Sequence, residues 1–126
     1  MRPLILLAIL GLAAVPGAAA DRRNEVPVAT PAGKPVDCLP LYQIRQSRVR
    51  NDQVIDFITP AGKVYRNTLP QSCPRLGFEE RFAYRTSISQ LCSSDIITVL
   101  QVGGPIQGAS CGLGKFQPVT IAKSAR

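Results

Sequence analysis

The chain has 126 residues, with 15 Lys or Arg against 8 Asp or Glu, a formal net charge of +7 and no histidine. Ser-His-Asp and Cys-His sites need an imidazole base, and no serine here stands three residues before a lysine, as Ser-Lys sites require. We therefore expect a basic, non-enzymatic protein without a cofactor.

Residues 1–20 have the layout of a secretory signal peptide. A single charge at Arg2 precedes an apolar run over residues 4–15, a Pro-Gly pair and small residues that end at Ala20. The run is too short to span a bilayer, which takes about 17–25 residues. We expect cleavage before Asp21, a periplasmic or secreted product, and no transmembrane segment in the mature protein.

Four cysteines remain after this cleavage, and in an oxidising compartment an even number predicts two disulfide bonds. No two of them are as close as the C-x₂₋₄-C pairs of zinc sites, and histidine ligands are absent. We expect neither a metal site nor a redox-active pair. The four are Cys38, Cys73, Cys92 and Cys111.

The mature chain is expected to have three parts. Residues 21–36 contain three prolines and no apolar periodicity, which indicates a flexible or extended leader. Residues 37–121 form one β domain, and residues 122–126 form a short tail.

Strand patterns fill the first half of the domain. Residues 41–45 read as a strand, and residues 53–59 and 63–69 flank a Pro-Ala-Gly turn, which predicts a hairpin. One helical turn is expected over residues 77–81.

Residues 81–86 alternate cleanly, with Phe82 and Tyr84 on one face and Arg81 and Arg85 on the other. A core-facing apolar side and a solvent-facing basic side are therefore expected on this strand.

The last two strand patterns differ in kind. Residues 95–102 are nearly all apolar or β-branched, which predicts a central strand covered on both sides. In residues 113–121, Pro118 cannot donate to a neighbouring strand, so we expect an edge strand or a bulge there.

Strands separated by frequent turn signals predict an all-β fold, a small antiparallel barrel or sandwich of about six strands, stapled by two disulfides. In an up-and-down order of strands, alternate connections lie at opposite poles of the sheet. This favours the pairs Cys38–Cys92 and Cys73–Cys111 over the two other pairings.

The triplet Ser93-Ser94-Asp95 follows a cysteine and precedes a strand, so it is a candidate for a reactive corner. A Ser-Asp pair without a base is a poor catalytic site, and Ser and Asp often bond to the backbone of their own turn. We expect a structural turn.

The segments "CLPLYQIR", "SCPRL", "LCSSDIITVL" and "CGLGKF" together resemble a family of small exported proteobacterial proteins of unknown function. The resemblance rests on the spacing of cysteines and strands over most of the mature domain. It implies a disulfide-containing β domain behind a signal peptide, and it carries over no catalytic or binding residues.

Positive charge is the one functional signal. Arg81 and Arg85 share a face, and we hypothesise that they form an anion-binding strip with Arg66 or Arg48 from a neighbouring strand. The expected ligand is an anionic envelope polymer, a lipid or an acidic protein, whereas nucleic acid does not fit an exported protein with few aromatic residues. The other interpretation of these arginines is an ordinary solvated face.

A second function class is a secreted inhibitor of an enzyme. Small disulfide-stapled β scaffolds suit this role because a rigid loop binds with little ordering cost. The glycine-rich loop from Gly103 to Ser110 is the segment that such an inhibitor would present.

Overall fold

The computed structural model describes Gly11 and residues 25–122. The rest of the predicted signal peptide, its cleavage point before Asp21 and residues 123–126 of the tail lie outside the described residues. Within the described part, no helix is long and apolar enough to cross a membrane.

The largest element is a five-stranded antiparallel sheet with the order β1-β10-β5-β4-β3. The predicted hairpin is confirmed: β4 and β5 pair directly, and in the turn between them Gly62, at a φ of 83°, donates its N–H to the Thr59 carbonyl (2.9 Å). The strands are β1 (Ala29–Pro31), β3 (Gln46–Val49), β4 (Val54–Ile58), β5 (Val64–Thr68) and β10 (Phe116–Ile121).

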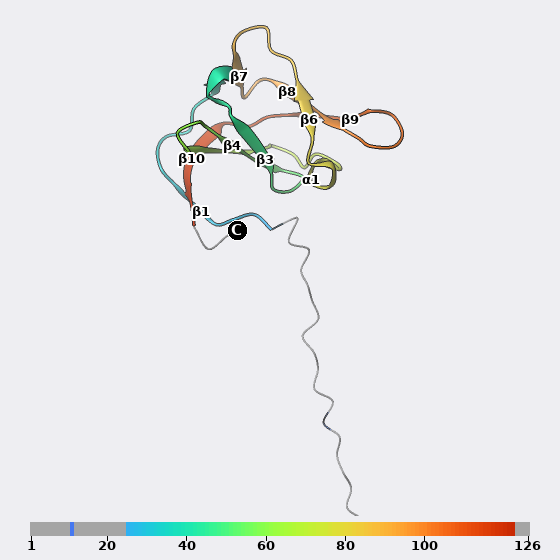
Figure 1. The fold of residues 1–126 in the computed structure, drawn as a ribbon, viewed down its shortest axis with the longest axis horizontal. Coiled ribbons are helices and arrows are strands. Elements are labelled where there is room, and N and C mark those ends of the chain that lie inside the picture. Colours follow the sequence, from blue (N-terminus) through green and yellow to red (C-terminus); the bar gives the residue numbers. More distant parts are fainter. Residues whose placement is uncertain (1–10, 12–24, 123–126) are drawn as a thin grey trace, which may run out of the picture.

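Two smaller antiparallel sheets complete the domain, one with the order β6-β8-β9 and one that pairs β2 with β7. Figure 1 places β7 and the start of β8 at the end of the domain opposite to β1. The strands are β2 (Cys38–Pro40), β6 (Phe82–Tyr84), β7 (Gln90–Cys92), β8 (Ile96–Leu100) and β9 (Gln107–Gly112); the helical turns are η2 (Leu41–Gln43) and α1 (Leu76–Glu79).

The core lies between the five-stranded sheet and the smaller sheets. Phe57 of β4 packs edge-on against Phe116 of β10, with ring centroids 5.4 Å apart, and against Phe82 of β6 at 6.3 Å. The fold is thus all-β and fits a sandwich; the described sheets do not close into a barrel. The buried cluster comprises Leu39, Ile55, Phe57, Leu69, Cys73, Leu76, Leu91, Ile97, Val99, Leu113 and Phe116.

Both predicted disulfides are confirmed. Cys38 and Cys92 lie directly opposite each other in the β2–β7 pair, and the second bond ties Cys73, which follows β5, to Cys111 within β9. The first bond therefore links the two strands of one small sheet, and the second links the loop after β5 to the three-stranded sheet.

Three strand predictions need correction. The chain forms the 3₁₀ turn η2 in place of the expected strand at residues 41–45, and β3 begins after it. β8 is the central strand of its sheet but is not covered on both sides: Ile97 and Val99 are buried whereas Ile96 is exposed. The alternation between buried and exposed side chains could not be predicted, because β8 carries β-branched residues on both faces.

Pro118 lies neither on an edge strand nor at a bulge, since β10 pairs with β1 on one side and β5 on the other. Its carbonyl accepts from Ala32 N (2.8 Å), which immediately follows β1. In a strand the N and C=O of one residue point to the same side. The missing donor therefore faces the end of the short β1, where no ladder continues.

The expected leader contributes to the fold. β1 pairs with β10, and the backbone groups of Val36 and Phe116 exchange hydrogen bonds of 2.9 and 2.8 Å. The folded unit begins before Asp37, the residue at which the sequence suggested a boundary.

Candidate anion-binding face

The strand β6 turns one side to the core and the other to solvent. Phe82 and Tyr84 are half-buried and pack against the core cluster, while Arg81, Ala83 and Arg85 are exposed. This distribution is the one that the alternation of residues 81–86 predicts. Two guanidinium groups thus lie along one edge of the exposed face of the three-stranded sheet.

The centre of this face is polar and carries small side chains. Ala83 pairs with Thr98, which in turn pairs with Ser110, and the Thr98 and Ser110 hydroxyl oxygens are 3.0 Å apart. We call the exposed side of β6, β8 and β9, with Arg81, Arg85, Thr98 and Ser110, the outer face. It offers hydroxyl donors beside the guanidinium groups.

A shallow hollow of about 570 Å³ lies on the outer face. It combines a guanidinium, hydroxyls, a carboxamide, the Asp95 carboxylate and apolar carbons, a mixture that suits a polar, charged ligand better than an apolar one. A second hollow, of about 420 Å³, has Lys63 as its one charged side chain. The first hollow is lined by Ala83, Tyr84, Arg85, Ser94, Asp95, Ile96, Thr98, Leu100 and Gln107.

Arg81 and Arg85 have no ion pair and no side-chain hydrogen bond within residues 25–122. Arg75, by contrast, pairs with Glu79 at 2.9 Å, and this hydrogen bond is the main reason that the pKa of Glu79 lies below its ordinary value. The two arginines that flank β6 therefore keep their donors available to a ligand.

The other two arginines of the predicted strip lie elsewhere. Arg66 is in β5 and Arg48 in β3, both in the five-stranded sheet, whereas the neighbour of β6 is β8. The expectation that either residue joins Arg81 and Arg85 from a neighbouring strand is therefore wrong. Alternation within a strand gives the face of a side chain but not the partner of the strand.

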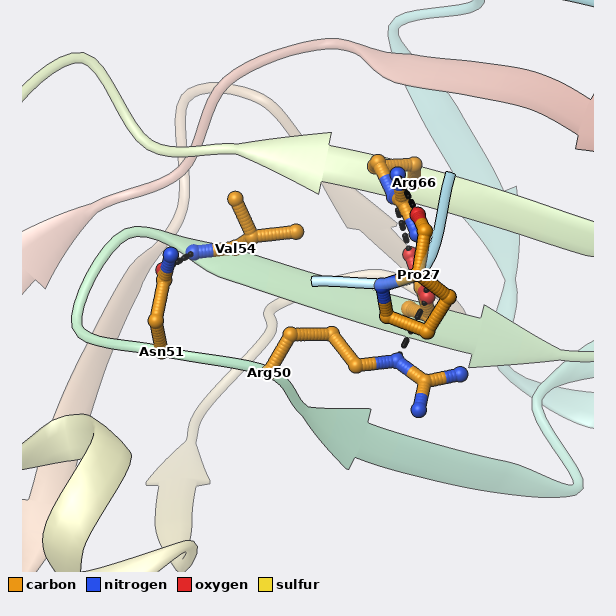
Figure 2. A network of polar contacts seen from close by, with 6 residues as sticks. Pro27, Arg50, Asn51, Val54 and Arg66 are labelled. Atoms are coloured by element: carbon orange, nitrogen blue, oxygen red, sulfur yellow. Dashed lines mark hydrogen bonds and ion pairs between the residues drawn. The ribbon is translucent and has the colours of Figure 1, made fainter. Parts of the chain in front are cut away.

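Arg66 has a structural task instead, shown in Figure 2. Its Nε and Nη2 donate to the two oxygens of Asp56 at 2.8 and 3.0 Å, and Arg50 Nε donates to Asp56 Oδ2 at 2.8 Å. Arg66 Nη1 also donates to the Pro27 carbonyl (2.9 Å). This cluster fastens the N-terminal segment onto the sheet.

Asp56 is the important residue that the sequence interpretation missed. It is fully buried, and both of its oxygens accept charge-assisted bonds. The signal was present, because an acidic residue in the middle of the apolar strand "VIDFI" must be paired when it is buried.

The triplet Ser93-Ser94-Asp95 forms a turn, as expected. Asp95 N donates to the Cys92 carbonyl at 2.9 Å, and Asp95 Oδ2 accepts from Cys92 N at 2.7 Å. Cys92 is held in its disulfide. The carboxylate is thus occupied by the backbone of its own turn.

Residues 25–122 contain no cluster of three or more metal-ligating side chains of the His, Cys, Asp or Glu type. Comparisons with protein-family models, curated proteins and solved structures found no match for this chain.

Proposed function

We propose that this chain is an exported, non-catalytic domain that binds an anionic component of the cell envelope through the outer face. The two disulfides already indicate a protein that works outside the cytoplasm. The periplasm is the compartment that we propose, following the signal-peptide pattern of residues 1–20.

One observation carries this proposal: four carboxylates of the fold are committed to structural bonds, while the guanidinium groups of Arg81 and Arg85 are not. Asp56 and Glu79 are paired with arginines, and Asp52 and Asp95 accept from backbone N–H groups. The excess positive charge is left on the surface. The outer face concentrates two of these charges beside hydroxyl groups.

The spacing of the two arginines favours an extended ligand. Four residues along a strand separate the two Cα atoms by about 13 Å, so each guanidinium has room for an anionic group of its own. A polymer or surface with repeated phosphate or carboxylate groups supplies several such groups at once. Guanidinium groups bind such oxygens in a bidentate manner.

The test compares two double variants that lose the same charge. Arg81→Ser with Arg85→Ser removes the pair on the outer face, and Lys34→Ser with Arg48→Ser removes two exposed cations elsewhere. Binding of the exported protein to polyphosphate and to lipopolysaccharide is measured against salt. We expect the first variant to bind at least about fivefold more weakly with a flatter salt dependence, and the control to stay within about twofold.

Equal losses in both variants would show that net charge alone, and not this face, drives binding. Folding of the Arg81/Arg85 variant should stay within about 1 kcal/mol of the parent, since exposed charges contribute little stability.

The inhibitor of an enzyme is the second proposal. Only part of the segment from Gly103 to Ser110 is a loop, because β9 begins at Gln107. The turn before it projects from the domain (Figure 1), with Gly103 and Gly104 at φ of 74° and 108°. A pull-down from periplasmic extract at low and high salt separates the proposals: one stoichiometric enzyme retained at high salt supports inhibition.

A further inference from the structure

We infer that one end of the domain, formed by η2, the β6–β7 loop and the start of β8, docks onto an anionic lipid bilayer. This inference rests on the proposed function and names a lipid surface as the anionic component. We call this end the docking tip and define it by Tyr42, Ile88, Ile96, Arg45 and Arg85.

Three large apolar side chains of the docking tip are strongly exposed: Tyr42 at 80%, Ile88 at 59% and Ile96 at 59%. Single exposed apolar residues are ordinary on a protein surface, and only a group of them indicates a binding surface.

Backbone contacts bring the segments of the docking tip together. Leu41 N, which precedes Tyr42, donates to the carbonyl of Ser89, which follows Ile88, at 3.0 Å. Pro40 and Gln90 are paired in the β2–β7 ladder. The two exposed side chains therefore project from chain segments that touch.

Ile96 lies beside Arg85 on the same end. Tyr84 pairs with Ile97, so the next step of the antiparallel register sets Arg85 opposite Ile96, and both line the hollow of the outer face. The docking tip is thus continuous with the outer face at its Arg85 end.

The charge of this end is one-sided. Residues 38–51 and 81–94 contain no Asp or Glu, but they include Arg45 and Arg85, both exposed. The acidic residues next to these ranges are Asp37, which lies 3.9 Å from Lys115 Nζ, Asp52, which accepts from Gly77 N, Glu80, and Asp95, which bonds to Cys92 N and lines the same hollow as Arg85. An excess of arginines over carboxylates is complementary to the phosphates of an anionic bilayer.

The apolar part fits a membrane interface better than a protein partner. Specific protein interfaces bury a continuous surface of about 800 Å² on each side. The docking tip has no continuous apolar surface, because polar residues such as Gln43 and Ser87 separate its three apolar side chains. Tyrosine is enriched at the level of lipid headgroups because its ring is apolar and its hydroxyl is polar. Shallow insertion needs no contiguous groove.

The orientation agrees with this role. β1 lies at the opposite end of the domain from β7 (Figure 1). A bilayer at the docking tip would leave that end of the fold unobstructed.

The first experiment measures binding of the full exported protein to vesicles of phosphatidylcholine with one quarter phosphatidylglycerol. Tyr42→Ser with Ile88→Ser should weaken vesicle binding at least about tenfold and leave polyphosphate binding within about twofold. Phe78→Ser with Val102→Ser is the matched control, since these side chains are equally exposed, at 67% and 70%, but lie outside the docking tip. It should bind vesicles as the parent does.

The second experiment uses the absence of tryptophan from the chain. Tyr42→Trp and Ile88→Trp should each show a blue shift in emission on the vesicles and quenching by brominated lipids, and Phe78→Trp should show neither.

The outcomes distinguish the proposed anion binding from docking onto a bilayer. A parent that binds polyphosphate but not vesicles overturns the docking tip and leaves the proposed function standing. A parent that binds neither overturns both. Unchanged vesicle binding by the Tyr42/Ile88 variant, an equal loss in the Phe78/Val102 control, or quenching at Phe78→Trp also overturns the docking tip.

Discussion

Asp56 holds together the ion-pair cluster of the five-stranded sheet. Its carboxylate has no exposure to solvent and is held by Arg50 and Arg66. Asp56→Asn keeps the shape of the side chain but leaves two partly buried cations without a counter-charge. We therefore expect the free energy of unfolding, measured in urea, to fall by about 3–5 kcal/mol. Asp37→Asn, at an exposed carboxylate 3.9 Å from Lys115, is the control and should stay within about 0.5 kcal/mol.

Gly114 is required by close backbone contact. A Cβ at this position would lie 2.2 Å from the Thr68 carbonyl oxygen, and the N–H and C=O of Gly114 both bond to the buried side chain of Asn67 (2.8 and 2.7 Å). Gly114→Ala must push the backbone at residue 114 away from β5. We expect the free energy of unfolding to fall by about 3 kcal/mol.

The control for this change is Gly112→Ala, because no atom lies within 4 Å of the Cβ position there. Thermal unfolding of both variants should separate them clearly. Equal midpoints would contradict the close approach of residue 114 to β5.

At the scale of elements, β6 joins the core and the outer face in three residues. Phe82 packs edge-on against Phe57, so Phe82→Ala should cost about 2–3 kcal/mol, less than the 3–5 kcal/mol of a fully buried phenylalanine, because Phe82 is only half-buried. Ala83→Ser on the exposed side should be neutral. A tolerated Phe82→Ala would mean that the faces of β6 are assigned backwards.

The helical turn α1 gives a prediction in acid. The pKa of Glu79 is lowered, first by the hydrogen bond from Arg75, so its ionised form is favoured in the folded state. The stabilisation is complete above the ordinary pKa of about 4.3 and is lost as the pH falls through the lower folded value. Glu79→Gln should therefore lose less stability than the parent on acidification below about pH 4.3, measured by urea unfolding at each pH.

Local patterns decided which elements could be predicted. β4 and β5 flank a Pro-Ala-Gly turn, and the alternation around Phe82 identified both the core side and the outer face. β1, β2 and β7 are three-residue strands whose sequences carry no periodicity. Their pairing is set by the Cys38–Cys92 bond and by contacts with β10.

For the candidate site, too, local patterns could be predicted and the pairing of strands could not. The shared face of Arg81 and Arg85, on either side of β6, follows from alternation, but the sheet that each strand joins does not. Arg66 and Arg48 were misplaced because tertiary pairing sends β5 and β3 to another sheet, and there the buried Asp56 requires Arg66 as a partner. The docking tip depends on the contact between η2 and the segment before β7, which no local pattern reports.

At the scale of the molecule, the sandwich is small and its sheets are short, so covalent links carry much of its stability. The total free energy of unfolding of a domain of this size is about 5–15 kcal/mol. The bonds Cys38–Cys92 and Cys73–Cys111 join residues 54 and 38 positions apart, and the chain-entropy relation gives about 4 kcal/mol for each.

Replacing both cysteines of one pair by alanine should therefore lower the free energy of unfolding by about 4 kcal/mol and keep a cooperative transition. The Cys73/Cys111 variant should lose more than the Cys38/Cys92 variant, because Cys73 is fully buried in the core and its sulfur leaves a void there. The variant without either bond loses an amount comparable to the whole stability and should be unfolded at 25 °C by circular dichroism. Cooperative urea unfolding of that variant at the parent's midpoint would show that the sandwich holds without its disulfides.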